Sequence, residues 1–298
     1  MKRKTNTAAV IKVPIPSNFK RKIVLNYYGR DPNRTSECVE KNKLQKAFLI
    51  DGIPSCLSID IKTRIALVSL RCDAIVNDNH LREQADIYAR MILGLNQPIE
   101  LFEKQAQQDR VLAKLIEASS GLRVPQASSA WEALISSIIG QQISVSAATS
   151  TRSRFISGIG AVHSSGLNCF PAASDIIGCG MAGLRDFGLS GAKASAILSL
   201  ARATLNGKLD FEGWRKNPDF GLITNNLLAF KGVGPWTVNY TLLRGFSYLD
   251  GSLHGDVVVR KKLCLLLGRE KMTAQEVEYW LLTYRPWRAL VAAHLWAM

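Results

Sequence analysis

The sequence predicts an α+β protein: a small α/β domain with an antiparallel sheet over residues 1–100, followed by an all-α domain over residues 101–298. Strand periodicity occurs only in the first hundred residues, and helical periodicity follows Pro98 with no convincing strand. A chain of 298 residues is also long enough to hold two domains and bury a substantial core. We expect the first domain to act chiefly as a scaffold.

The sheet is indicated by short apolar runs separated by turn signals. The run at residues 46–50 leads into Asp51-Gly52, a pair typical of hairpin turns. Residues 57–62 alternate apolar and polar side chains, and residues 65–70 predict a further strand. From His80 the pattern becomes helical, with an apolar stripe at Leu81, Ala85, Tyr88, Ala89 and Ile92.

The second part predicts short helices joined by glycine-containing turns. Residues 101–118 predict one amphipathic helix. Ser128 or Ser129 can cap the next, which carries apolar residues at i, i+3, i+4, i+7 and i+8: Trp131, Leu134, Ile135, Ile138 and Ile139. Ser144 can cap a helix through Phe155, and Ser190 begins another.

One glycine-rich link lies between two of these helical runs. Residues 230–237 read Phe-Lys-Gly-Val-Gly-Pro-Trp-Thr, with apolar helical runs on both sides. Gly232 and Gly234 permit positive φ and close approach of another backbone, and Pro235 suits the first helical position. The link therefore predicts a helix, a tight hairpin and a helix. Free amides at the second helix's N-terminus form an anion site, which suits a DNA phosphate.

The charge of the chain also favours a polyanionic partner. The net charge is +14 and the isoelectric point is about 9.7. Residues 1–30 contribute +8 as a basic tail, whose role the sequence leaves open. No apolar run approaches the length of a membrane span. The six cysteines show no CxxC spacing, which is typical of reduced thiols in the cytosol, and the four histidines form no metal-ligand pattern.

Asp256 is the candidate catalytic residue. It follows Gly255 and precedes the apolar run at residues 257–259, where a helix would begin. That position alone indicates an N-cap, the commonest reason for an aspartate before such a run. The hairpin lies twenty-two residues upstream, and the catalytic interpretation depends on what this pair of features resembles.

A Gly-Val-Gly-Pro hairpin followed at this distance by Gly-Asp resembles the signature of the helix-hairpin-helix DNA glycosylases. Three more segments extend the resemblance: residues 131–144, residues 185–194 and the tail at residues 285–296. The tail is similar to the bacterial 3-methyladenine DNA glycosylase II branch, whose members also carry an N-terminal α/β domain. The resemblance is weak before residue 100 and strong after Ala130.

The resemblance implies that Asp256 supports the chemistry of base release. The target base must leave the duplex, and positive charge develops on the sugar as the bond from C1′ to the base breaks. A carboxylate beside C1′ stabilises that charge and orients or deprotonates the attacking water. One carboxylate suffices when the leaving purine is already cationic, as N3- and N7-alkylated purines are.

The resemblance also assigns the base pocket and the DNA contacts. Trp236, Tyr240 and Trp296 match aromatic positions that line the pocket, where π faces attract a cationic purine. The alternative is that these three are core residues. DNA contacts fall to Gly232, Val233, Gly234 and Gln142. Gln142 stands where the branch often has an apolar wedge, and Val257 replaces a tyrosine sometimes found there.

The resemblance further implies hydrolysis without lyase chemistry. Trp236 occupies the position of the lysine that forms a Schiff base in lyase branches. Only Cys264 follows Asp256, so the four-cysteine iron–sulfur site of another branch is missing. The expected protein is a cytoplasmic, nucleoid-associated monomer that acts on double-stranded DNA carrying alkylated bases. We expect no cofactor, with a monovalent cation at the hairpin as the one optional ion.

Two alternatives remain open. The protein could excise neutral lesions such as hypoxanthine or 8-oxoguanine, which would need more hydrogen-bonding groups in the pocket. It could also be a non-enzymatic DNA-binding module that uses the hairpin only for grip. Asp256 argues against the second alternative, because a pure binder gains nothing from a carboxylate beside phosphates.

Overall fold

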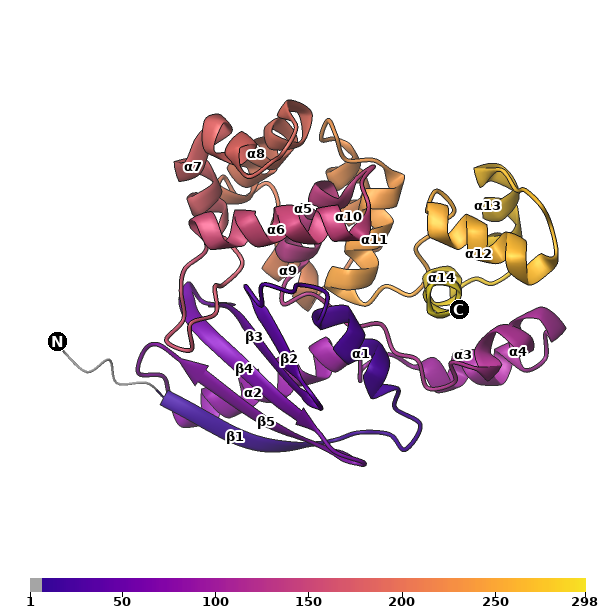
Figure 1. The fold of residues 1–298 in the computed structure, drawn as a ribbon, viewed down its shortest axis with the longest axis horizontal. Coiled ribbons are helices and arrows are strands. Elements are labelled where there is room, and N and C mark those ends of the chain that lie inside the picture. The colour runs from indigo at the N-terminus through magenta and orange to yellow at the C-terminus, as the bar shows by residue number, and fades with distance from the viewer. Residues whose placement is uncertain (1–6) are drawn as a thin grey trace.

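The computed structural model describes residues 7–298, and the first six residues of the basic tail lie outside that range. It confirms the predicted α+β class, with a five-stranded antiparallel sheet followed by helices (Figure 1). Beyond Pro98 the structure has no strand in the part of the chain that it describes, only an isolated bridge between Val162 and Asn168. No helix in residues 7–298 is long and apolar enough to cross a membrane.

The sheet has the strand order β1-β5-β4-β3-β2, and every neighbouring pair is antiparallel. Its strands are β1 (Thr7–Pro14), β2 (Glu37–Glu40), β3 (Lys43–Ile50), β4 (Ile53–Ile61) and β5 (Ile65–Cys72). Asp51 and Gly52 form the predicted turn, both with positive φ. The edge strand β1 was not predicted, because Ala8 and Val10 place apolar residues on its exposed face and so hide the alternation.

Two helices belong to the first domain. Helix α2 (Asp78–Leu93) packs on β1, β4 and β5, and its predicted apolar stripe is buried. Helix α1 (Arg21–Tyr28) contacts β2 and lies between the sheet and the helical domain (Figure 1). The core of this domain draws on residues 9–93.

The remaining helices form the second part of the chain. They are α3 (Ile99–Ala106), α4 (Arg110–Glu117), α5 (Ala130–Gly140), α6 (Val145–Ile159), α7 (Ala173–Asp186), α8 (Gly191–Leu205), α9 (Phe211–Lys216), α10 (Phe220–Leu228), α11 (Pro235–Phe246), α12 (Val257–Leu267), α13 (Ala274–Leu282) and α14 (Arg288–Ala297). Ser129, Ser144 and Ser190 cap α5, α6 and α8.

The single helix predicted over residues 101–118 is wrong. The structure has two helices there, α3 and α4, with a break at residues 107–109. Asp109 has an extended backbone, and its carboxylate accepts hydrogen bonds from the amides of Val111 and Leu112. An aspartate that caps a new helix competes with continuation of the old one, and apolar periodicity does not reveal this.

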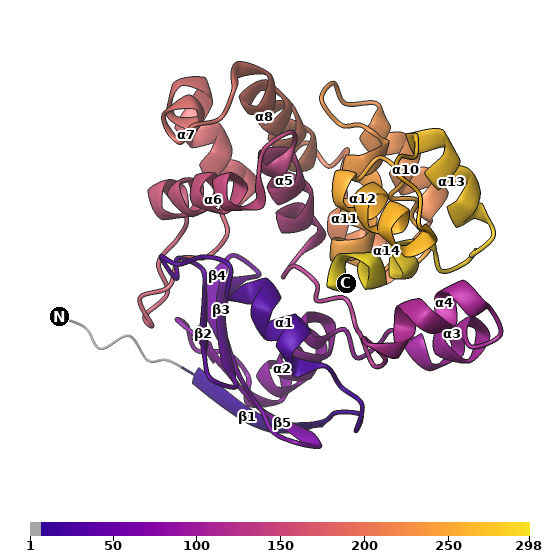
Figure 2. The ribbon, with the colours of Figure 1, turned by 45° about the vertical axis from the view of Figure 1, so that its right-hand side comes forward.

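The helical domain has two apolar cores, and α11 lies between them (Figure 2). Val238 and Leu242 belong to the core of α5–α10, whereas Leu243 belongs to the core of α3, α4 and α12–α14. Trp236 and Tyr240 pack against the second core. Helix α11 therefore presents one face to each core, and the face toward α14 carries the predicted aromatic residues.

A buried cluster of four charged side chains joins the two domains. Lys46 Nζ on β3 lies 2.7 Å from Glu37 and 2.8 Å from Glu132 of α5. Arg152 of α6 pairs with the same two carboxylates at 2.8 and 2.5 Å. Lys46 is 1 % exposed. The two cations and two anions balance, as burial of charge requires.

Candidate active site and nucleic-acid interface

The hairpin between α10 and α11 uses its two glycines differently. Gly232 has φ of +91°, a conformation that favours glycine, and a Cβ there would lie 3.0 Å from the Cβ of Ala196. Gly234 has φ of −104°, so the expectation of a positive φ holds for Gly232 alone. A Cβ on Gly234 would meet nothing within 4 Å. Its surface therefore remains open to close approach from outside.

The hairpin presents backbone rather than side chains. Val233 is buried, and its amide donates to the carbonyl of Phe230 at 3.0 Å. Gly234 is the N-cap of α11 with no side-chain cap, and Pro235 opens the helix. The first-turn amides of α11 therefore have no capping side chain, which is the arrangement of an anion site.

The loop between α5 and α6 is tied to this hairpin. The side-chain amide of Gln141 donates to the carbonyl of Gly232 at 2.9 Å and to the hydroxyl of Thr237 at 2.8 Å. Lys193 donates to the carbonyls of Ile139 and Gln141, both at 2.8 Å. These contacts leave the predicted DNA contact Gln142 exposed, with φ of +57°.

Asp256 is both an N-cap and the centre of a converging set of donors. One carboxylate oxygen accepts from the amides of Val258 and Val259, each at 2.9 Å, at the start of α12. The indole N–H of Trp296 reaches that oxygen at 3.3 Å, and the indole N–H of Trp236 reaches the other at 3.0 Å. Four donors therefore fix the position of the carboxylate.

The three predicted aromatic residues form one cluster beside Asp256. Trp236 and Tyr240 stand one turn apart on α11, with stacked rings whose centroids lie 5.1 Å apart. Trp296 faces Tyr240 from α14, with centroids 6.2 Å apart and planes tilted by 58°. All three are half-buried and pack against the core of α3, α4 and α12–α14. A base between Tyr240 and Trp296 would need roughly 7–8 Å of separation, twice an ordinary carbon contact, so Trp296 must shift to admit one.

The structure brings the predicted residues together around the first half of α11. Gly232, Val233 and Gly234 lead into α11, which carries Trp236 and Tyr240, and Asp256 closes the group. Sequence reasoning missed two residues. Gln141 ties the loop between α5 and α6 to the hairpin, and the guanidinium of Arg244 lies against the ring of Tyr240. The spacing of Arg244, four residues after Tyr240, is a signal that could have found it.

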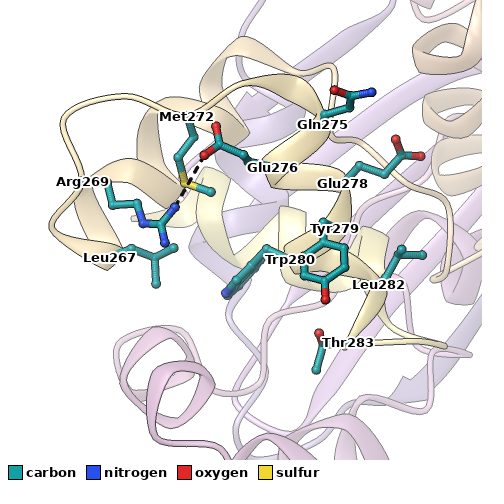
Figure 3. Close-up of a pocket in the computed structure, with 10 residues that line it drawn as sticks. All are labelled: Leu267, Arg269, Met272, Gln275, Glu276, Glu278, Tyr279, Trp280, Leu282 and Thr283. Atoms are coloured by element: carbon teal, nitrogen blue, oxygen red, sulfur yellow. Dashed lines mark ion pairs between the residues drawn. The ribbon is translucent and has the colours of Figure 1, made fainter.

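A cavity outside this site lies beside α13. It has a volume of about 660 Å³ and its lining includes Leu267, Arg269, Tyr279 and Trp280 (Figure 3). None of its lining residues belongs to the cluster around Asp256. Cavity volume does not identify the site around Asp256, because the aromatic rings there pack on one another. No group of three or more metal-ligating side chains gathers within residues 7–298.

The hairpin and Asp256 both lie within a segment that matches a known protein family. The HhH-GPD superfamily of base excision DNA repair proteins matches residues 135–284, half of the chain. The chain belongs to this superfamily. The HhH-GPD match covers the hairpin, Trp236, Tyr240 and Asp256, and it ends before Trp296.

Two relatives of this chain are both named as DNA-3-methyladenine glycosylases. The DNA-3-methyladenine glycosylase of Bacillus subtilis is 26% identical over 292 residues, with 96% of each chain covered. The DNA-3-methyladenine glycosylase 2 of Escherichia coli is 27% identical over 191 residues, with 62% of this chain and 63% of that protein covered.

Solved structures share the fold over nearly the whole chain. The 3-methyladenine DNA glycosylase of Archaeoglobus fulgidus superposes with a TM-score of 0.83 at 22% identity, and 96% of each chain is covered. The 8-oxoguanine glycosylase/lyase of Clostridium acetobutylicum in complex with double-stranded DNA gives a TM-score of 0.73 at 13% identity. These likenesses concern the fold, and the site itself must indicate the chemistry.

Proposed function

We propose that this protein is a monofunctional DNA glycosylase that excises alkylated purines, of the 3-methyladenine and 7-methylguanine type, and leaves an abasic site. The observation that supports this most directly is the carboxylate of Asp256, held by four donors beside two indoles. The names of the Bacillus subtilis and Escherichia coli relatives agree with it.

The geometry of Asp256 suits a reaction in which charge develops on the sugar. A carboxylate already fixed by hydrogen bonds needs no reorganisation when the cation forms at C1′, which is the basis of electrostatic preorganisation. The same group can orient the attacking water. Because an alkylated purine leaves as a neutral base, the site needs no general acid, and we propose no cofactor.

The surroundings of Asp256 suit a flipped, electron-poor base. Trp236, Tyr240 and Trp296 offer π faces that attract a cation by about 0.5–2 kcal/mol per contact. The hairpin amides offer a phosphate site at the N-terminal end of α11, where Trp236 also stands, so the backbone and the base can be held together. We propose double-stranded DNA as the partner and a monomer as the acting form.

The first expected result concerns the product. Incubation with methylated duplex DNA should release methylpurines and leave an intact abasic strand, which breaks only after alkali or heat. Borohydride should trap no covalent adduct, because an indole at position 236 cannot form a Schiff base. Chromatography of the released bases and a denaturing gel measure both points. A nick at the lesion without alkali would exclude the monofunctional mechanism.

Trp296→Ala should slow the release of 3-methyladenine by about ten- to a hundredfold, because one base–aromatic stack is worth about 1–3 kcal/mol. Affinity for undamaged duplex should change little, since the stack forms only after the base has left the helix. Single-turnover excision and duplex binding separate the two effects. Trp280→Ala removes a tryptophan from α13, outside the site, and is the control. Normal excision by Trp296→Ala would remove Trp296 from the pocket.

Gly234→Val should weaken binding to all duplex sequences alike, because phosphate contacts carry no sequence information. A Cβ at position 234 would meet no protein atom within 4 Å, so we expect the loss to come from the DNA that the hairpin approaches. Gly191→Val is a control, since Gly191 also lies at the N-terminal end of a helix and its Cβ would meet nothing within 4 Å. Equal affinities of the two variants in a duplex titration would argue against the hairpin as the phosphate site.

A further inference from the structure

Arg244 continues the line of aromatic residues along α11. It stands four residues after Tyr240 and eight after Trp236, so all three share one face of the helix. Its guanidinium carbon lies 5.7 Å from the ring centroid of Tyr240 and 5.5 Å from that of Trp296. The side chain is only 5 % exposed. A fixed positive charge therefore lies behind the rings that border Asp256.

Other parts of the chain hold this guanidinium in place. One terminal nitrogen donates to the carbonyl of Pro125 at 2.7 Å. The guanidinium carbon lies 4.3 Å from the ring centroid of Tyr27, which comes from α1 of the N-terminal domain. Burial raises the pKa of Tyr27 well above its usual value, so its ring stays neutral. The N-terminal domain therefore contacts this site through Tyr27.

The donors of Arg244 are not all used. Its buried Nε has no hydrogen-bond acceptor among residues 7–298, and no carboxylate in that range forms an ion pair with it. A buried donor without a partner is costly, and arginine has no acceptor and stays charged. Such a donor suits a ligand that brings its own acceptor.

If the sugar of a flipped purine lies at Asp256, the edge of the base opposite the sugar points away from Asp256. Arginine side chains on a helix lean toward the N-terminus, which brings the Arg244 guanidinium back toward Tyr240 and Trp236. The far edge of a guanine-type base carries an oxygen at position 6, whereas an adenine-type base carries an amino group there. The oxygen accepts from a guanidinium, and the amino group would oppose donor to donor.

We propose that Arg244 determines specificity by donating to the 6-oxo group of the flipped purine, so that the pocket favours guanine-type over adenine-type alkylated bases. This inference rests on the proposed function. The guanidinium repels both cationic methylpurines alike, so that repulsion cancels when the two are compared. Tyr27 is a positioning residue that holds the guanidinium from behind.

The test compares two bases released from one substrate. Duplex DNA methylated with dimethyl sulfate contains both 7-methylguanine and 3-methyladenine, and chromatography measures the initial rates of release of both. Arg244→Met should lower the ratio of 7-methylguanine to 3-methyladenine release by about tenfold or more, the value of one hydrogen bond to a charged group. Partial unfolding lowers both rates together and leaves the ratio unchanged.

Four further variants separate specificity from structure. Arg123→Met removes another buried arginine, which pairs with Glu100 away from the site, and should leave the ratio unchanged. Arg244→Lys keeps the charge but loses the planar fork, so the ratio should fall by a smaller factor. Tyr27→Leu should lower the ratio a few fold, and Tyr27→Phe, which keeps the ring, should restore it.

The outcomes are distinct. A wild-type protein that releases neither methylpurine would overturn the proposed function and this inference with it. Release of both bases with the same ratio in wild type and Arg244→Met would overturn the inference alone. An equal fall of the ratio in Arg123→Met would also overturn it, because the effect would then belong to buried arginines in general.

Discussion

Asp256→Asn should reduce base release by at least about a hundredfold, while binding to DNA with an abasic-site analogue stays within a few fold. The substitution removes the negative charge that would stabilise the sugar cation, and losses of this size are typical when one such group is lost. It also places an amide nitrogen opposite the indole N–H of Trp236, which now donates to the carboxylate at 3.0 Å. Single-turnover excision of 3-methyladenine measures the effect.

The control for this substitution is Asp219→Asn. Asp219 caps α10 through one hydrogen bond to the amide of Leu222, and it makes no contact with the aromatic cluster. Asparagine caps a helix about as well as aspartate, so Asp219→Asn should keep normal stability and activity. If Asp256→Asn kept more than about a tenth of the activity, a loss of less than ~1.4 kcal/mol, Asp256 would not be the catalytic carboxylate.

Lys46→Met should lower the free energy of unfolding by about 3–5 kcal/mol, because it leaves the two buried carboxylates of Glu37 and Glu132 with the guanidinium of Arg152 as the one cation that pairs with them. Glu132→Gln combined with Lys46→Met restores the charge balance and should cost less than the sum of the single changes. Denaturant unfolding measures all three. Lys62→Met is the control, since the exposed pair of Lys62 with Asp60 contributes at most about 1 kcal/mol.

The same cluster predicts how stability depends on pH. Burial alone raises the pKa of Glu132, but Lys46 and Arg152 outweigh it and lower that pKa to about 2. The pKa of Glu37 is lowered for the same reason. A carboxyl group whose pKa is lowered by folding stabilises the folded state at pH values above its ordinary pKa of 4.5. This stabilisation is lost as the pH falls toward the folded-state pKa of about 2. Lys46→Met should flatten this acid dependence in unfolding curves.

Local signals in the sequence predicted the elements whose ends are set by neighbouring residues. The turn at Asp51 and Gly52, the serine caps of α5, α6 and α8, and the hairpin at residues 229–234 all depend on local backbone chemistry. Apolar periodicity predicted the buried stripe of α2, because side chains three and four positions apart lie on one face of a helix. It failed at α3 and α4, where the cap at Asp109 decides the boundary and periodicity does not report it.

By itself, the sequence determined the α+β class, the hairpin and the position of Asp256 at the start of a helix. The tertiary structure decided what surrounds that carboxylate. Trp236 and Trp296 lie sixty residues apart and meet on one carboxylate only because α11 and α14 each place an indole at the start of α12. Arg244 meets Tyr27 across two domains. Contacts between distant residues depend on how helices and sheet pack in three dimensions, and no spacing along the chain encodes that packing.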